Sequence, residues 1–218
     1  MRPEELFDVQ GQQEVTEAVK AVERESAAEV VPVVVSAAGN YPQAPWRAAS
    51  LGALGGAALV SLFLRMVDVW GLPLEFWVVA PPFLGAGLGV LLTRTLPSVA
   101  RLLLTPEEMA TQVRERAEHA FLTEEVFATK GRTGMLILVA LFERQVVVLG
   151  DRGIAARIPQ ERWQSIANHV AQGIRQGRPV QALVAGIRQC GQLLVEAGVT
   201  VQPGDTNELS DQLRLSER

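Results

Sequence analysis

The sequence predicts an α/β domain, in which a small mixed sheet is flanked by helices, interrupted by a transmembrane helical hairpin. The hairpin is predicted because Ala48–Leu64 and Phe76–Thr93 contain no ionisable residue, and a helix needs roughly 17 or more apolar residues to cross a thin bilayer. The sheet is predicted because short, strongly apolar runs alternate with amphipathic helical patterns, and such strands need cover on both faces.

Composition limits the classes of function that this chain can serve. The 218 residues carry a net charge of −4 and have a mean hydropathy of +0.18, so no overall basic field is present to attract nucleic acid. The single cysteine, Cys190, excludes an intramolecular disulfide. Residues 1–45 show no signal-peptide pattern, so the first segment expected to insert into a membrane is Ala48–Leu64.

Two elements are predicted before the membrane segment, within residues 1–45. Gln13–Ser26 reads as a helix, because Val15, Val19 and Val22 recur on one face. Glu29–Ser36 reads as a strand, since it is rich in valine. Pro32 interrupts this run and cannot donate a ladder hydrogen bond, so the strand is expected at an edge or with a bulge.

The predicted hairpin occupies residues 46–101, with spans at about 48–64 and 76–93. Arg47 precedes the first span, and Arg94 and Arg101 follow the second, whereas the connecting loop also contains acids. By the positive-inside rule, this bias predicts a two-pass protein whose soluble part is cytoplasmic. The alternative is a helical hairpin buried in the core of a soluble domain.

Small residues recur at helical spacing in both spans. Gly52 and Gly56 form one GxxxG pattern, and Gly85 and Gly89 form another. Such faces allow two helices to approach closely in lipid. Pro81-Pro82 should either kink the second helix or mark its beginning.

Residues 102–201 are predicted to complete the domain, with 202–218 as a polar C-terminal segment. A helix should begin at Thr105, because a capping residue is followed by proline and two glutamates. A hairpin of two strands and two further helices should follow; their ranges are Met135–Ala140, Gln145–Leu149, Pro159–Ile174 and Pro179–Val195. The first helix and strand are too few to fold alone, so they should pair with these later elements.

Several segments together resemble the TPM domain family, and in particular its bacterial membrane-protein branch. The match is carried mainly by Leu138–Ile158, which reads LVALFERQVVVLGDRGIAARI. Ala27–Val31, Ala120-Phe121, Thr129–Gly134 and Trp163 fit in order. Pro203–Asp211 resembles a recurrent Asn-Glu-Leu-Pro-Asp segment, with Ser210 in the place of proline.

This resemblance implies an α/β sandwich that is tethered to a membrane. Plant relatives are associated with photosystem repair and have been described as acid phosphatases, and an animal relative is an accessory subunit of a receptor channel. Members often carry an aspartate and glycine segment before the first helix, tied to ion binding or proposed catalysis. Here only Asp8 and Gly11 stand in its place.

Asp151 is the best single candidate for a metal or polar site, since it follows a strand and precedes a glycine turn. Glu29 begins the first strand and would approach Asp151 if the two strands are neighbours. Two carboxylates suit a hard cation such as calcium; beyond this, no cofactor is expected. The alternative for Asp151 is a turn residue that binds nearby backbone N–H groups. No catalytic residue is assigned.

Five basic residues are predicted to face the membrane surface: Arg47, Arg94, Arg101, Lys130 and Arg132. The loop that contains Lys130 and Arg132 lacks the spacing of a P-loop, so no nucleotide is expected. We expect the bilayer and other membrane proteins as partners. The predicted function is a membrane-anchored, non-enzymatic accessory or scaffold for membrane or envelope proteins. One alternative is a phosphatase-like hydrolase that depends on a divalent cation held by Asp151. Another is a sensor of the lipid surface that uses Arg47, Arg101, Lys130 and Arg132.

Overall fold

The computed structural model describes residues 2–66, 73–201 and 206–217, and it divides into two compact units. Met1–Gly39 and Met109–Arg218 form one unit, here called the sandwich. Asn40–Glu108 form the other, here called the hairpin unit. Part of the predicted loop between the spans (67–72), and Pro203–Asp205 of the terminal segment, lie outside the described residues.

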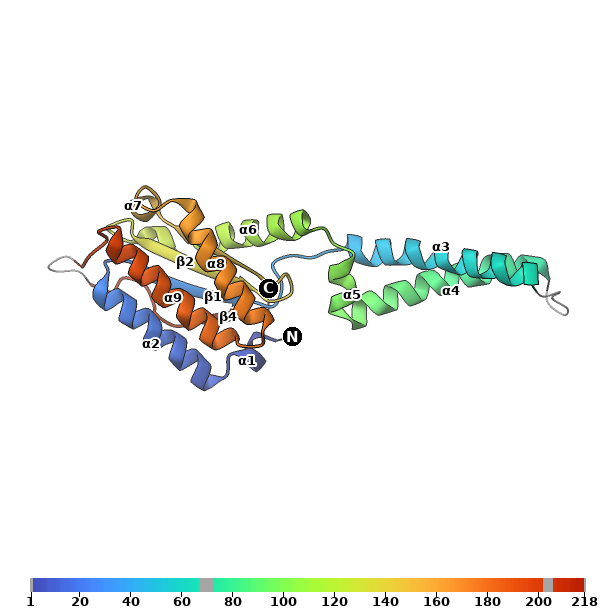
Figure 1. The fold of residues 1–218 in the computed structure, drawn as a ribbon, viewed down its shortest axis with the longest axis horizontal. Coiled ribbons are helices and arrows are strands. Elements are labelled where there is room, and N and C mark those ends of the chain that lie inside the picture. Colours follow the sequence, from blue (N-terminus) through green and yellow to red (C-terminus); the bar gives the residue numbers. More distant parts are fainter. Residues whose placement is uncertain (1, 67–72, 202–205, 218) are drawn as a thin grey trace. The chain divides into compact units, whose positions relative to one another are not determined.

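The sandwich contains a four-stranded mixed sheet in the order β3-β2-β1-β4, shown in Figure 1. Strand β1 (Glu29–Val35) pairs parallel with β2 (Gly134–Ala140), and β2 pairs antiparallel with β3 (Gln145–Gly150). The three-residue β4 (Arg214–Ser216) pairs parallel with the end of β1. The predicted mixed sheet is therefore confirmed, and strands from before and after the hairpin unit lie side by side.

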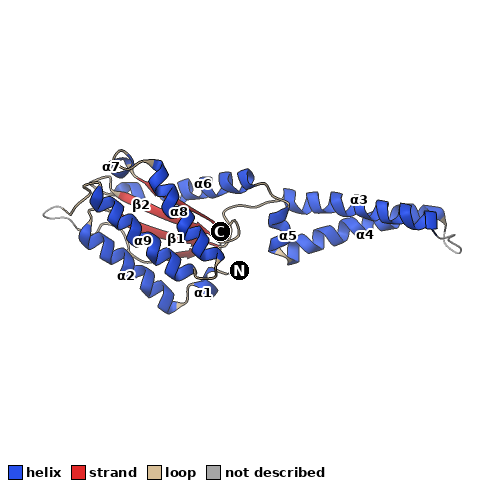
Figure 2. Cartoon of the chain, in the orientation of Figure 1, coloured by secondary structure: helices blue, strands red, loops and turns tan. Residues whose placement is uncertain are grey.

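Helices cover both faces of this sheet (Figure 2). One face packs on α2 (Val9–Glu25), α8 (Gln160–Arg175) and α9 (Pro179–Glu196), and this core includes Val30 and Ile137. The other face packs on α6 (Pro106–Thr123) through Val113 and Ala117. The strands alternate their side chains between two buried layers, which explains why β1 and β2 are apolar throughout.

Pro32 occupies a position on β1 where only one neighbour strand is present. Its partner on one side is Ile137 of β2, whereas β4 pairs only with Val33–Val35. The backbone nitrogen of Pro32 therefore needs no ladder partner. The prediction of an edge is confirmed at this position, although β4 places the end of β1 inside the sheet.

The hairpin unit consists of α3 (Gln43–Met66), α4 (Leu74–Thr95) and α5 (Pro97–Leu102). Glycines lie where α3 and α4 meet: a Cβ added to Gly52 would stand 2.0 Å from the carbonyl oxygen of Gly85, and one added to Gly56 2.3 Å from that of Pro81. The two GxxxG faces therefore pack on each other within the chain. Helix α4 runs through Pro81 and Pro82, so the expectation that the helix begins there is wrong.

Short elements at the ends of the sheet were not predicted. These are α1 (Pro3–Leu6), the 3₁₀ turn η1 (Val126–Ala128), α7 (Arg152–Ala155) and β4. Helix α2 also begins at Val9, four residues before the expected start, because Asp8 caps it by accepting a hydrogen bond from the Gly11 N–H at 2.7 Å. The Asp8–Gly11 segment thus serves as a helix cap in this chain.

Candidate functional site

Asp151 lies directly after β3 and caps α7. Its carboxylate accepts a hydrogen bond from the backbone N–H of Arg152 at 2.7 Å and lies 3.4 Å from a guanidinium nitrogen of Arg132. The same Arg132 nitrogen donates to the carbonyl oxygen of Phe127 at 2.8 Å. Asp151 is buried, so these contacts hold the 127–132 loop on the end of β3.

Glu29, the first residue of β1, is also buried and has a different set of donors. Its two carboxylate oxygens accept hydrogen bonds from the backbone N–H groups of Glu208 and Leu209, both at 3.2 Å. Burial raises the pKa of Glu29, and the two backbone donors oppose that rise. Glu29 therefore holds the C-terminal segment against the sheet.

The two candidate metal ligands lie at the same end of the sheet, in one row across three strands. Glu29 pairs with Gly134 of β2, and the Asp151 N–H donates to the carbonyl oxygen of Gly134 at 2.9 Å. Gly134 thus stands between them. A Cβ added to Gly134 would lie 1.9 Å from the carbonyl oxygen of Val126, so this oxygen fills the space that a side chain would need. The loop that contains Val126 therefore covers the row between Glu29 and Asp151.

Two further acids near Glu29 were missed by the sequence analysis. Glu23, Glu29 and Asp211 line one cavity of about 250 Å³, together with Ser26 and Asn207. Desolvation, together with the smaller effects of the neighbouring carboxylates Asp211 and Glu29, raises the pKa of Glu23 to about 8. Glu23 also accepts a hydrogen bond from the Val30 N–H at 3.0 Å. No sequence spacing signals this group, because Asp211 approaches from 188 residues away along the chain.

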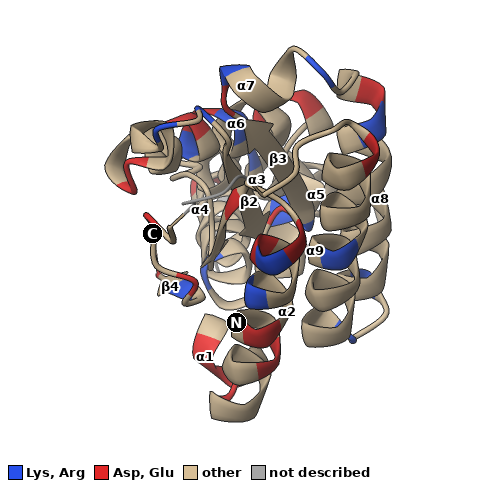
Figure 3. Cartoon of the chain, turned by 90° about the vertical axis from the view of Figure 1, so that its left-hand side faces the viewer, with Lys and Arg blue, Asp and Glu red and all other residues tan. Residues whose placement is uncertain are grey.

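Across residues 2–66, 73–201 and 206–217, no three His, Cys, Asp or Glu side chains are grouped so as to hold a metal ion. Figure 3 shows that acidic and basic residues lie along α2 and α8, whereas β2 and β3 carry none.

The five predicted membrane-surface residues fall in two different units. Arg47, Arg94 and Arg101 belong to the hairpin unit, at the beginning of α3 and in the last turns of α4 and α5. Lys130 and Arg132 belong to the sandwich. Arg47 forms two short hydrogen bonds with Glu108, and Lys130 pairs with Glu208 at 3.0 Å.

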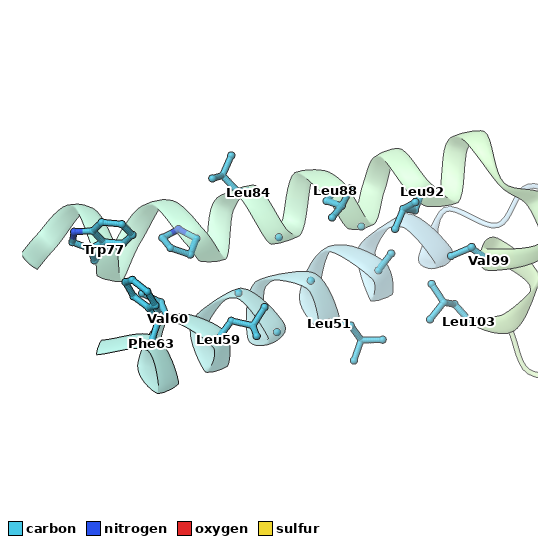
Figure 4. Close-up of a pocket in the computed structure, with 17 residues that line it drawn as sticks. Leu51, Leu59, Val60, Phe63, Trp77, Leu84, Leu88, Leu92, Val99 and Leu103 are labelled. Carbon is cyan, nitrogen blue, oxygen red and sulfur yellow. The ribbon is translucent and has the colours of Figure 1, made fainter. Parts of the chain in front are cut away.

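An apolar groove of about 750 Å³ runs along α3 and α4 (Figure 4). Leu51, Leu59 and Phe63 line it from α3, and Leu84, Leu88 and Leu92 line it from α4. Its floor is formed by the glycines at which the two helices meet. A groove of this chemistry suits hydrocarbon rather than a polar substrate.

Comparison with known proteins finds a known domain in part of the chain. The TPM domain model matches residues 91–193. The BA42 protein of the psychrophilic bacterium Bizionia argentinensis has a similar fold in solution, with a TM-score of 0.58 and 17% sequence identity over 98% of this chain and 97% of that one. No curated protein matches this chain. The resemblance read from the sequence is thereby confirmed, and the chain carries a TPM domain.

Proposed function

We propose that this chain is a TPM-domain protein anchored in a membrane by α3 and α4, where it serves as a non-enzymatic accessory or scaffold for other membrane or envelope proteins. The observation that carries the membrane part is the exposed apolar surface of the two helices. Leu59, Phe83 and Leu84 are 70%, 74% and 72% exposed. Only 6% of each candidate span is buried, which differs from the core helices of a soluble domain.

The packing of the hairpin also supports insertion into lipid. The backbones of α3 and α4 approach at Gly52, Gly56, Gly85 and Gly89, whereas most leucines of the two helices are exposed. Close packing through small residues stabilises helix pairs in lipid, where burial of leucine against leucine offers no advantage over contact with acyl chains. In water, the same arrangement would leave most of the apolar side chains unfavourably solvated.

The scaffold part of the proposal is supported by the contacts of the candidate site. The carboxylates of Asp151 and Glu29 bind backbone N–H groups of the chain itself, so both act to hold loops on the sheet. No contact of Asp151 specifically favours the hydrolase alternative. The positive flanks of the spans support a cytoplasmic sandwich.

Membrane insertion can be tested on the full chain expressed in a bacterial host. Membranes washed with alkaline carbonate should retain the protein, because washing removes peripheral proteins but leaves spanning helices in place. A variant with Leu59→Asp, Leu84→Asp and Leu88→Asp should be released. Complete release of the wild-type chain would contradict the anchor, and crosslinked membranes that repeatedly yield the protein alone would contradict the scaffold.

Thiol labelling can test on which side of the membrane the sandwich lies. Cys190 is fully buried, so a cysteine placed at the exposed Gln160 would be the accessible thiol. A membrane-impermeant maleimide should label Gln160→Cys only after the membrane is opened. Labelling in intact spheroplasts would place the sandwich outside.

A further inference from the structure

A polar groove of about 470 Å³ lies between the second half of α8 and the first half of α9. The two helices approach closely beside it, because a Cβ on Gly173 would lie 2.5 Å from that of Ala182. None of the residues that line it is acidic. Its polar side chains are His169, Gln172, Gln176, Arg178, Gln181 and Gln189.

This groove reaches the end of the sandwich at which the chain leaves for the hairpin unit, here called the exit end. Strand β1 finishes there at Val35, and the turn between β2 and β3 packs on it, since the Phe142 N–H donates to the carbonyl oxygen of Ser36 at 2.9 Å. Arg175, in the last turn of α8, donates to the carbonyl oxygen of Arg144 in that turn. Arg178 follows at the start of α9.

Arg144, Arg175 and Arg178 are all exposed at the exit end. Within the described part of the chain, they do not take part in the ion pairs of the sandwich. At the opposite end, Lys130, Arg132 and Arg162 are each paired with a carboxylate, whereas Arg157 donates to the carbonyl oxygen of Gly198. Arg175 donates one hydrogen bond to the carbonyl oxygen of Arg144, and Arg178 donates one to the side-chain oxygen of Gln176. Each guanidinium group carries five N–H donors, so donors remain at the exit end for an anion.

The covalent path of the chain fixes which anions this end can meet. Only Asn40–Pro42 separate Gly39, the last residue of this part of the sandwich, from the first residue of α3. Three residues of extended chain reach about 10 Å. If α3 enters the bilayer, as the proposed function requires, then this linker tethers Gly39, at the exit end, within about 10 Å of the first residue of the inserted helix.

We propose that the groove between α8 and α9, with Arg178 in its wall and Arg144 and Arg175 beside it, seats the phosphate of an anionic phospholipid head group. Guanidinium groups bind phosphate oxygens through paired N–H donors. The glutamine amides supply donors and acceptors that suit the hydroxyl groups of a glycerol head group. Each basic residue near an anionic leaflet strengthens attachment about five-fold, so three contribute on the order of 100-fold.

The test uses the full chain in lipid nanodiscs that carry a nitroxide on a fraction of the head groups. A fluorophore is attached at Gln13→Cys, because Gly11 touches Val180 and so places the start of α2 beside the start of α9. A second protein carries the fluorophore at Gln160→Cys, at the opposite end of α8. Discs contain phosphatidylcholine alone or with phosphatidylglycerol.

We expect phosphatidylglycerol to increase quenching at position 13 at least two-fold and to leave position 160 unchanged. The triple variant Arg144→Gln, Arg175→Gln, Arg178→Gln should return quenching to the level in phosphatidylcholine. The matched triple variant at the opposite end, Arg152→Gln, Arg157→Gln, Arg162→Gln, should behave as wild type. Arg178→Gln alone should give the largest single loss.

Quenching at position 13 that does not depend on phosphatidylglycerol, or that survives the exit-end triple variant, would overturn the inference. If Arg144→Gln, Arg175→Gln and Arg178→Gln each reduced quenching by the same amount, the groove would not be the binding site of the phosphate. Relief of quenching by inorganic phosphate, but not by sodium chloride of equal ionic strength, would show a site for free phosphate instead. Extraction of the chain by alkaline carbonate would contradict the proposed function itself, and this outcome is distinct from all of these.

Discussion

Arg47 of α3 and Glu108 of α6 form a bidentate ion pair within the hairpin unit. The two guanidinium nitrogens lie 2.9 Å and 2.7 Å from the two carboxylate oxygens of Glu108. Arg47 also donates to the carbonyl oxygen of Leu103 at 2.7 Å. The pair therefore joins the beginning of the first apolar helix to the chain that follows the second, which closes the base of the hairpin.

Replacement of Glu108 should open this base without removing any apolar contact. The hydrogen bonds from Arg47, followed by those from Thr105, lower the pKa of Glu108 to about 2. Since the pKa is lower in the folded state, the stabilisation is fully present above about pH 4.5 and is lost as the pH falls toward 2. We expect Glu108→Gln to lower the melting temperature at pH 6 and to have little effect near pH 2. Melting in detergent between pH 2 and 6 measures this.

Glu107→Gln is the matched control, because Glu107 neighbours Glu108 on the same helix and forms no ion pair within the described residues. Its melting curve should follow that of wild type at every pH. An effect of Glu108→Gln that is equal at pH 2 and pH 6 would show that Glu108 acts through its helix cap at Thr105 rather than through Arg47.

Gly52→Ala should separate α3 from α4. The new Cβ would stand 2.0 Å from the carbonyl oxygen of Gly85, which is backbone and cannot rotate away. Overpacking of this kind costs about 1–3 kcal/mol. Thermal denaturation in detergent micelles, followed by size-exclusion chromatography, should show a clear fall in the melting temperature.

Gly55→Ala provides the comparison, since no atom lies within 4 Å of its added Cβ. This substitution should be neutral or stabilise the helix by up to about 1 kcal/mol. If Gly52→Ala and Gly55→Ala melt alike, the close approach of the two helices does not contribute to the stability of the hairpin.

The sequence predicted the elements whose pattern is set by burial. The valines of β1 and the apolar run of β2 pair as expected, because a strand covered on both faces must be apolar throughout. The same patterns placed α8 and α9 within one residue of their observed bounds. These features depend on each segment alone, so they can be read from one sequence.

The candidate site could be predicted only in part, because its contacts join segments distant in the chain. Glu29 was expected to approach Asp151 only if their two strands were neighbours, and β2 lies between β1 and β3. Nothing in the sequence spacing indicated that Gly134 and the carbonyl group of Val126 would stand between the two carboxylates. In the sequence, Glu23 lies beside the apolar positions Val19 and Val22 of an amphipathic helix, where an exposed acid is the ordinary expectation. Its burial follows from the C-terminal segment, whose short strand β4 carries no apolar periodicity.

Asp151→Ala should destabilise the sandwich by about 0.5–2 kcal/mol, the usual effect of removing a helix N-cap. Asp151→Asn retains an oxygen that can accept a hydrogen bond from the Arg152 N–H, so this variant should lose less stability than Asp151→Ala. Urea denaturation measures both variants. A phosphate-ester hydrolysis activity in purified wild type that Asp151→Asn abolishes, with stability maintained, would contradict the structural role and restore the hydrolase alternative.

The stability of the sandwich should fall between about pH 4.5 and pH 8 because of Glu23. Its pKa is raised by burial to about 8 in the folded protein, from 4.5, so the folded state binds a proton that the unfolded state has released. The stabilisation is therefore complete below about pH 4.5 and is lost as the pH rises through 8.

Glu23→Gln keeps an acceptor for the Val30 N–H and has no charge to place beside Asp211. At pH 8 it should exceed wild type in stability by roughly 1–3 kcal/mol, after allowance for partial solvent access. Glu17→Gln, which changes an exposed acid of the same helix, should preserve the wild-type dependence on pH. Urea denaturation at pH 5 and pH 8 distinguishes the three proteins, and parallel behaviour of Glu23→Gln and wild type would mean that Glu23 is ionised in the folded state throughout this range.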